Sequence, residues 1–158
     1  MSGTVVLGIG NRLGGDDAAG TGVVDILNRR QQGGKALPPY ELVAIDAGPA
    51  PESYTSVVRR RRPDLLILVD AADMGLPPGA LRIITPEKIS VPSFSTHHMP
   101  LSALVSYVQE FCGEVLLVGV QPEQVETGSR LSKAVRKGVE ELAGAILEGR
   151  AKEIPLLE

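Results

Sequence analysis

The stretch VVLGIGNRLGGDDAAG, from Val5 to Gly20, decides the fold that this sequence predicts. It begins as a short apolar run, which is typical of a buried strand. Glycines then interrupt the run and allow a tight turn. Two adjacent carboxylates, Asp16 and Asp17, follow where apolar residues start to recur at helical spacing. The stretch therefore predicts a strand, a turn and a helix, with an acidic pair at the carboxyl end of the strand, where open α/β sheets collect their ligands.

One aspartate of this pair suits the N-cap of the helix, and the second needs another explanation. A nucleotide-binding α/β domain is one alternative, but Leu13 stands where the G-x-G-x-x-G pattern needs its third glycine. The lysine and hydroxyl residue of a P-loop are also missing, and two carboxylates at a helix start would repel a phosphate. The acidic pair therefore favours a cation over a nucleotide.

The composition excludes several classes of protein. The chain has 158 residues, which predicts a single domain, 1–158, whose last residues, 148–158, we expect to form a mobile tail. Aromatic residues make up 3% and the net charge is −3, so we expect no nucleic-acid partner. No apolar run approaches the roughly 20 residues that cross a membrane. The single Cys112 excludes an internal disulfide and fits a reducing, cytoplasmic location.

The rest of the chain alternates between strand and helix patterns. The strands are expected at Glu41–Ile45, Leu65–Val69, Ala80–Ile84 and Glu114–Val120, and the helices after Pro51, after Pro100 and from Leu131 to Leu147. The run Leu65–Val69 has no polar alternation, which predicts a central strand covered on both faces. Ala80–Ile84 follows a tight connection, so we expect it to be antiparallel and at an edge. The pattern predicts an α/β three-layer sandwich with a mostly parallel, mixed sheet of about five strands flanked by helices.

Carboxylates follow three of these strands, and the only two histidines lie in one loop. Asp17 follows the first strand, Asp46 the second and Asp70 the third, while His97 and His98 precede a later helix. Two carboxylates and one imidazole form an incomplete shell for a divalent metal, with positions left open for a substrate. No G-x-S-x-G elbow or H-E-x-x-H helix is present. Cys112 falls on an apolar helix stripe, which favours a core role over a nucleophile.

Four segments of the sequence resemble the hydrogenase maturation endopeptidases. These are GIGNRLGGDDAAG, LLILVDAADMGLPPGALRII, STHHMPL and GEVLLVGVQPE, and the resemblance is greatest to the branch that processes formate-hydrogenlyase-type large subunits. It covers roughly residues 4–147, in order and with few gaps. The resemblance implies an endopeptidase that removes the C-terminal extension of a [NiFe]-hydrogenase large-subunit precursor after nickel has been inserted.

The family's metal-contacting residues correspond to Asp17, Asp70 and His97, which we therefore predict to be both the catalytic and the metal-binding residues. Nickel is expected to arrive with the precursor, and the isolated enzyme could hold another divalent metal. Asp16 and Asp46 are expected to be capping or supporting groups, and the role of His98 stays open. We expect a monomer. The alternative from another class is a nickel-binding checkpoint or carrier without peptidase activity, since the sequence shows no nucleophile.

Overall fold

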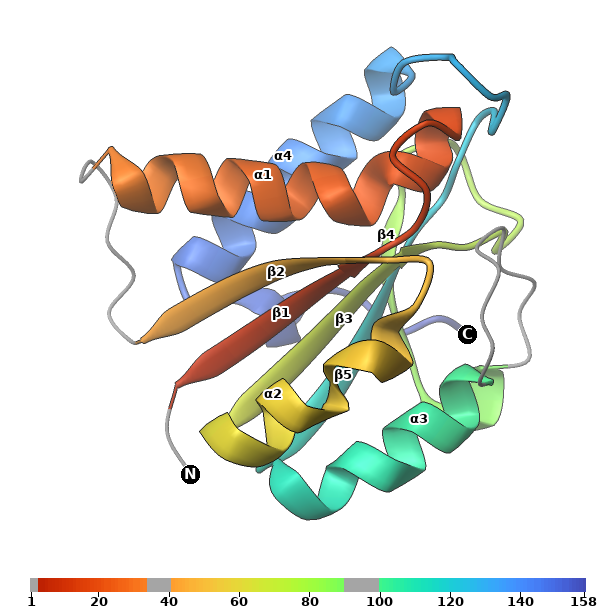
Figure 1. Cartoon of the computed structure of the whole chain (residues 1–158). Coiled ribbons are helices and arrows are strands. Elements are labelled where there is room, and N and C mark those ends of the chain that lie inside the picture. The colour runs from red at the N-terminus through yellow and green to blue at the C-terminus, as the bar shows by residue number, and fades with distance from the viewer. Residues whose placement is uncertain (1–2, 34–40, 90–99) are drawn as a thin grey trace.

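A five-stranded sheet forms the centre of the molecule, as the computed structural model shows (Figure 1). The structure describes residues 3–33, 41–89 and 100–158. The strands are β1 (Thr4–Ile9), β2 (Leu42–Gly48), β3 (Leu65–Ala71), β4 (Leu81–Ile84) and β5 (Glu114–Val120), in the order β2-β1-β3-β5-β4. All neighbouring pairs are parallel except β4 with β5. The predictions of a mixed sheet, of β3 at its centre and of an antiparallel strand at its edge are confirmed.

Helices cover both faces of this sheet. The long helices α1 (Ala19–Gln32) and α4 (Lys133–Leu147) lie on one face, and α2 (Thr55–Arg61) and α3 (Leu101–Val108) lie on the other (Figure 1). Short 3-10 helices precede two of the α-helices: η1 (Gly15–Ala18) lies before α1, and η2 (Pro51–Tyr54) lies before α2. Three more follow other elements: η3 (Pro86–Lys88) comes after β4, η4 (Gln109–Phe111) after α3, and η5 (Ala151–Glu153) after α4. None of the helices in the described part of the chain combines the length and apolar character needed to span a bilayer.

The central strand β3 explains why the sheet is covered on both sides. Ile67 and Val69 are buried against α1 and α4, whereas Leu66 and Leu68 are buried against α2 and α3. Successive side chains of a strand point to opposite faces, so a continuous apolar run needs two layers of helices. Cys112 is buried on the same side of the sheet as Leu66 and Leu68, as its place on the apolar helix stripe predicted.

Residues 148–158 differ from the mobile tail that the sequence suggested. Ala151 and Ile154 are buried, and the backbone of the tail pairs with the edge strand β4. Ile83 donates its N–H to the carbonyl of Pro155 at 2.8 Å and accepts the N–H of Leu157 at 2.8 Å. The tail therefore covers part of an edge that would otherwise expose unpaired backbone groups.

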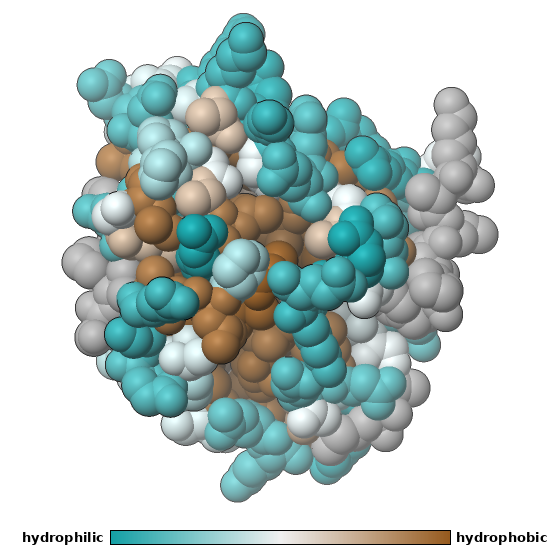
Figure 2. Space-filling view, turned by 180° about the vertical axis from the view of Figure 1, so that it is seen from behind, coloured by the Kyte–Doolittle hydropathy of each residue, from teal (hydrophilic) through white to brown (hydrophobic). Residues whose placement is uncertain are grey.

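Seen from behind, the molecule shows an apolar area bordered by hydrophilic side chains (Figure 2).

Candidate active site at the carboxyl edge of the sheet

Asp17 is held close to the end of β1 by a turn that only glycine fits. Gly10 has a φ of +139°, and a Cβ at this position would overlap the carbonyl oxygen of Asp17. The backbone N–H of Asn11 donates to Asp17 Oδ2 at 3.0 Å. The side chain of Asp17 is consequently fixed at the strand end, with 6% of the residue exposed.

The first turn of α1 brings Asp17 to the same edge as Asp70. Gly20 packs against β1 and β3 at once, since a Cβ there would lie 2.5 Å from the carbonyl oxygens of Ile9 and Val69. Asp70 follows Val69 in β3 and is 2% exposed. Because β1 and β3 are parallel neighbours, their carboxyl ends meet at one edge of the sheet. The structure thus brings the two predicted carboxylates to one edge, although Asp70 lies within its strand and not after it.

A cleft of about 380 Å³ opens beside Asp17. Its walls also contain Asp46 and Arg12, in addition to Gly10, Asn11, Gly48 and Pro49. Asp46 lies within β2, two residues before the strand ends, and accepts hydrogen bonds from Thr21 Oγ1 at 3.2 Å and from the N–H of Gly48 at 3.0 Å. The prediction of a supporting role for Asp46 agrees with these contacts.

Arg12 is a residue of the cleft that the sequence did not single out. Its guanidinium pairs with Asp46 at 3.0 Å and with Asp25 at 3.0 Å, and the hydrogen bonds to Asp25 and then to Asp46 raise the pKa of Arg12. One arginine therefore accompanies three carboxylates, those of Asp17, Asp25 and Asp46, and Asp70 adds a fourth at the same edge. This excess of negative charge suits a cationic ligand.

Asp16 makes no side-chain cap bond to the helical turn that follows it, so of the two roles expected for it, capping or supporting, its contacts agree with the supporting one. It is completely buried and its carboxylate accepts hydrogen bonds from Glu123, Gln124 and Ser132, which lie more than 100 residues away in the chain. Burial opposes ionisation of Asp16, but the hydrogen bonds from Ser132, Gln124 and Glu123 outweigh it and lower the pKa of Asp16. Asp16 is thus a carboxylate that joins two distant loops.

His97 and His98 lie outside the described residues, so the structure does not place the predicted imidazole. Within residues 3–33, 41–89 and 100–158, no three His, Cys, Asp or Glu side chains are grouped as a metal site would require. The donors that the described part contributes are hard carboxylate oxygens, which suit divalent cations and leave the shell incomplete without a further ligand.

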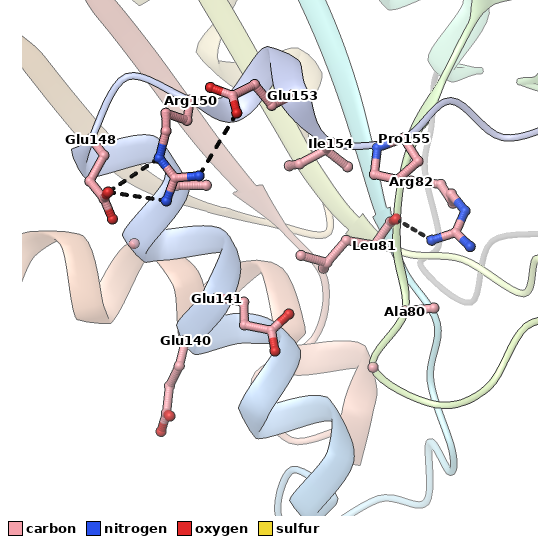
Figure 3. A pocket seen from close by; sticks show the side chains of 13 residues that line it. Ala80, Leu81, Arg82, Glu140, Glu141, Glu148, Arg150, Glu153, Ile154 and Pro155 are labelled. Carbon is pink, nitrogen blue, oxygen red and sulfur yellow. Dashed lines mark hydrogen bonds and ion pairs between the residues drawn. The ribbon is translucent and has the colours of Figure 1, made fainter.

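A larger groove, of about 650 Å³, lies elsewhere, between α4, β4 and the C-terminal residues (Figure 3). Arg150 crosses it and pairs with Glu148 at 3.0 Å and with Glu153 at 4.0 Å. Among the described residues, the lining of this groove contains neither Asp17 nor Asp70, whereas Asp17 lines the smaller cleft.

The sequence also missed Gln121, the first residue after β5. The residue is 7% exposed and its amide bonds to the loop that leaves β3. A polar residue followed by proline directly after an apolar strand was the available signal, because a buried amide must find partners.

The fold is a mostly parallel α/β sheet with a carboxylate-rich cleft at its carboxyl edge. A family model of hydrogenase maturation proteases matches residues 23–149. The chain is 38% identical to the hydrogenase 3 maturation protease of Escherichia coli K12 over 137 residues, which are 86% of this chain and 83% of the relative. The chain belongs to the hydrogenase maturation protease family.

Solved structures agree with this assignment. The solution structure of the endopeptidase HycI from Escherichia coli superimposes with a TM-score of 0.85 at 34% identity, covering 100% of this chain and 97% of that chain. The crystal structure of a [NiFe] hydrogenase maturation protease HycI from Thermococcus kodakarensis KOD1 gives a TM-score of 0.78 at 31% identity, covering 96% and 93%. These findings support a peptidase role in hydrogenase maturation and do not support the carrier alternative.

Proposed function

We propose that this endopeptidase removes the C-terminal extension of a nickel-loaded [NiFe]-hydrogenase large-subunit precursor and uses the nickel of the precursor to recognise it. The observation that carries the proposal is the meeting of Asp17 and Asp70 at one edge of the sheet, beside a cleft with excess negative charge. Buried carboxylates attract a cation more strongly than exposed ones, because the protein screens charge less than water does. A cation that arrives with the substrate therefore finds a site already arranged for it.

We propose that His97 completes the ligand set. Its imidazole is the borderline donor that nickel prefers, whereas Asp17 and Asp70 supply oxygens. The three side chains then contact the metal of the precursor from one side, so that only a loaded precursor is held with its scissile bond at the cleft. Contact with the nickel of the precursor thus both selects the loaded precursor and positions its scissile bond.

The reaction is hydrolysis of one peptide bond. A water molecule adds to the scissile carbonyl carbon, the C–N bond breaks, and the proton of the water goes to the leaving amine. The products are a large subunit with a new C-terminal carboxylate and a short peptide with a new N-terminal amine. A cation next to the scissile bond polarises its carbonyl and lowers the pKa of a nearby water.

The test is incubation of purified nickel-loaded and nickel-free precursor with wild-type enzyme and with the variants Asp17→Asn, Asp70→Asn and His97→Ala. We expect the wild type to shorten only the loaded precursor on a denaturing gel, and each variant to be at least about 100-fold slower. Asp64→Asn is the matched control, since Asp64 precedes the same strand β3 at the opposite edge of the sheet. Wild-type rates for His97→Ala would refute its assignment, and an unshortened precursor in every lane would indicate a carrier.

The proposal includes a monomeric enzyme whose nickel is supplied by the precursor. Sedimentation of the purified protein checks the monomer, and metal analysis of the same sample checks for a resident ion. Cleavage by a metal-stripped enzyme at the wild-type rate is the expected result, because the nickel enters with the substrate.

A further inference from the structure

We infer that the connection between β5 and α4, residues 121–132, is a positioning element that fixes the placement of Asp17 relative to Asp70. This inference rests on the proposed function of these two carboxylates. The segment begins with Gln121, Pro122 and Glu123, a motif that the proposed chemistry does not use. It lies at the carboxyl edge of the sheet and bonds to both of the loops that adjoin the two acids.

The first attachment is through Asp16, the residue before Asp17. Asp16 Oδ2 accepts hydrogen bonds from the N–H groups of Glu123 at 2.8 Å and Gln124 at 3.0 Å and from Ser132 Oγ at 2.7 Å, and Oδ1 accepts the N–H of Ser132 at 2.7 Å. In the reverse direction, the N–H of Asp16 donates to the carbonyl of Gln124 at 2.9 Å. Hydrogen bonds to an ionised acceptor are stronger than those between neutral groups, and four such bonds fix the position and orientation of the Asp16 carboxylate.

Ser132 shows that this attachment replaces an ordinary cap. It is the N-cap residue of α4, and its hydroxyl would normally accept an N–H from the first turn of that helix. No such cap bond is made; the hydroxyl donates to Asp16 instead. The local stabilisation of α4 is thus given up in favour of a contact with the loop before Asp17.

The second attachment is through Gln121, which holds the loop after Asp70. Gln121 Oε1 accepts the N–H of Met74 at 2.6 Å and of Leu76 at 3.3 Å, and Nε2 donates to Asp73 Oδ1 at 3.2 Å. The strand β3 ends at Ala71, so these bonds fix the chain three to six residues after Asp70. A residue that is 7% exposed and uses both ends of its amide has little freedom to adjust.

One segment therefore bonds to the chain immediately before Asp17 and shortly after Asp70. The loop that carries Asp17 is also held at an earlier point, where the N–H of Gly128 donates to the carbonyl of Leu13 at 2.7 Å. A loop needed only for connection would not require buried contacts with two different neighbours. If the two carboxylates must grip one ion together, their separation has to be set by a common support, and the segment provides it. Asp16 and Gln121 are positioning residues in this role.

The experiment compares Asp16→Asn and Gln121→Ala with Val58→Ala in steady-state cleavage of the nickel-loaded precursor. Val58 of α2 is completely buried in the opposite layer, so its truncation lowers stability away from both attachments. We expect kcat to fall by roughly 10- to 100-fold for Asp16→Asn and Gln121→Ala, since a shift of about 1 Å at a catalytic group has an effect of this size. Val58→Ala should lower the melting temperature and leave kcat within about twofold at a temperature where all proteins are folded.

A milder variant keeps the test decisive if Asp16→Asn does not fold. Ser132→Ala removes one of the four hydrogen bonds to the Asp16 carboxylate and retains the backbone ones, so a loss of roughly three- to tenfold in kcat is expected. The positioning role is overturned if Ser132→Ala and Gln121→Ala keep the kcat of Val58→Ala. Failure of the proposed function looks different, because Asp17→Asn would then cleave as fast as the wild type, or the wild type would not cleave at all.

Discussion

Gly20 offers a direct test of how α1 positions Asp17. The substitution Gly20→Ala places a Cβ 2.5 Å from two carbonyl oxygens, those of Ile9 in β1 and Val69 in β3, whereas an ordinary contact begins at 3.4 Å. Both neighbours are backbone atoms inside a sheet and cannot rotate away. The helix itself must therefore move outward by roughly 1 Å, and Asp17, three residues earlier, moves with it.

The expected effects follow from this shift. Overpacking of a dense interior costs about 1–3 kcal/mol of folding free energy. A displacement of roughly 1 Å at Asp17 should lower kcat by about 100-fold. Thermal unfolding measures the first effect, and cleavage of the nickel-loaded precursor, followed on a gel at a temperature where the variant is folded, measures the second.

Gly144→Ala is the matched control, because Gly144 is also a helical glycine but a Cβ added there would meet nothing within 4 Å. Alanine is the better helix former, so this variant should gain about 0.5–1 kcal/mol and keep wild-type activity. For a chain of this size the gain corresponds to a rise of roughly 1–4 °C in melting temperature. If Gly20→Ala is as stable and as active as Gly144→Ala, the close approach of α1 to β1 and β3 does not position the site.

Three further predictions concern residues outside the carboxylate pair. Burial raises the pKa of Cys112 to about 11 from 9.0, so the thiol of the folded protein should resist iodoacetamide at pH 8, and rapid labelling would contradict this. The free energy of unfolding should fall as the pH rises from 9 through 11, because in this range only the unfolded thiol ionises. Arg12→Ala breaks exposed ion pairs, so unfolding should change by less than about 1 kcal/mol while calorimetry shows tighter Ni²⁺ binding by the isolated protein. Ending the chain after Glu153 removes buried Ile154 and the pairing with β4, which should lower stability by about 2–4 kcal/mol in urea unfolding.

The sequence by itself determined the layers of this protein and one edge of its sheet. The unbroken apolar run of β3 required helices on both faces, and the alternation of strands and helices placed Asp17 and Asp70 at the carboxyl edge. These inferences succeeded because side-chain periodicity and the direction of parallel strands are local properties of the chain.

Only the tertiary structure decided which residues support the two carboxylates at the carboxyl edge of the sheet. The hydrogen bonds from the N–H of Ser132 to Asp16 and from the N–H of Met74 to Gln121 join residues far apart in the chain, and no spacing in the sequence specifies them. The docking of the tail on β4 was missed for the same reason, since a short segment without periodicity gains its order from a surface that other elements form. Capping residues, charged side chains and buried amides form hydrogen bonds with whichever polar groups the folded chain places beside them, so their partners depend on the tertiary structure.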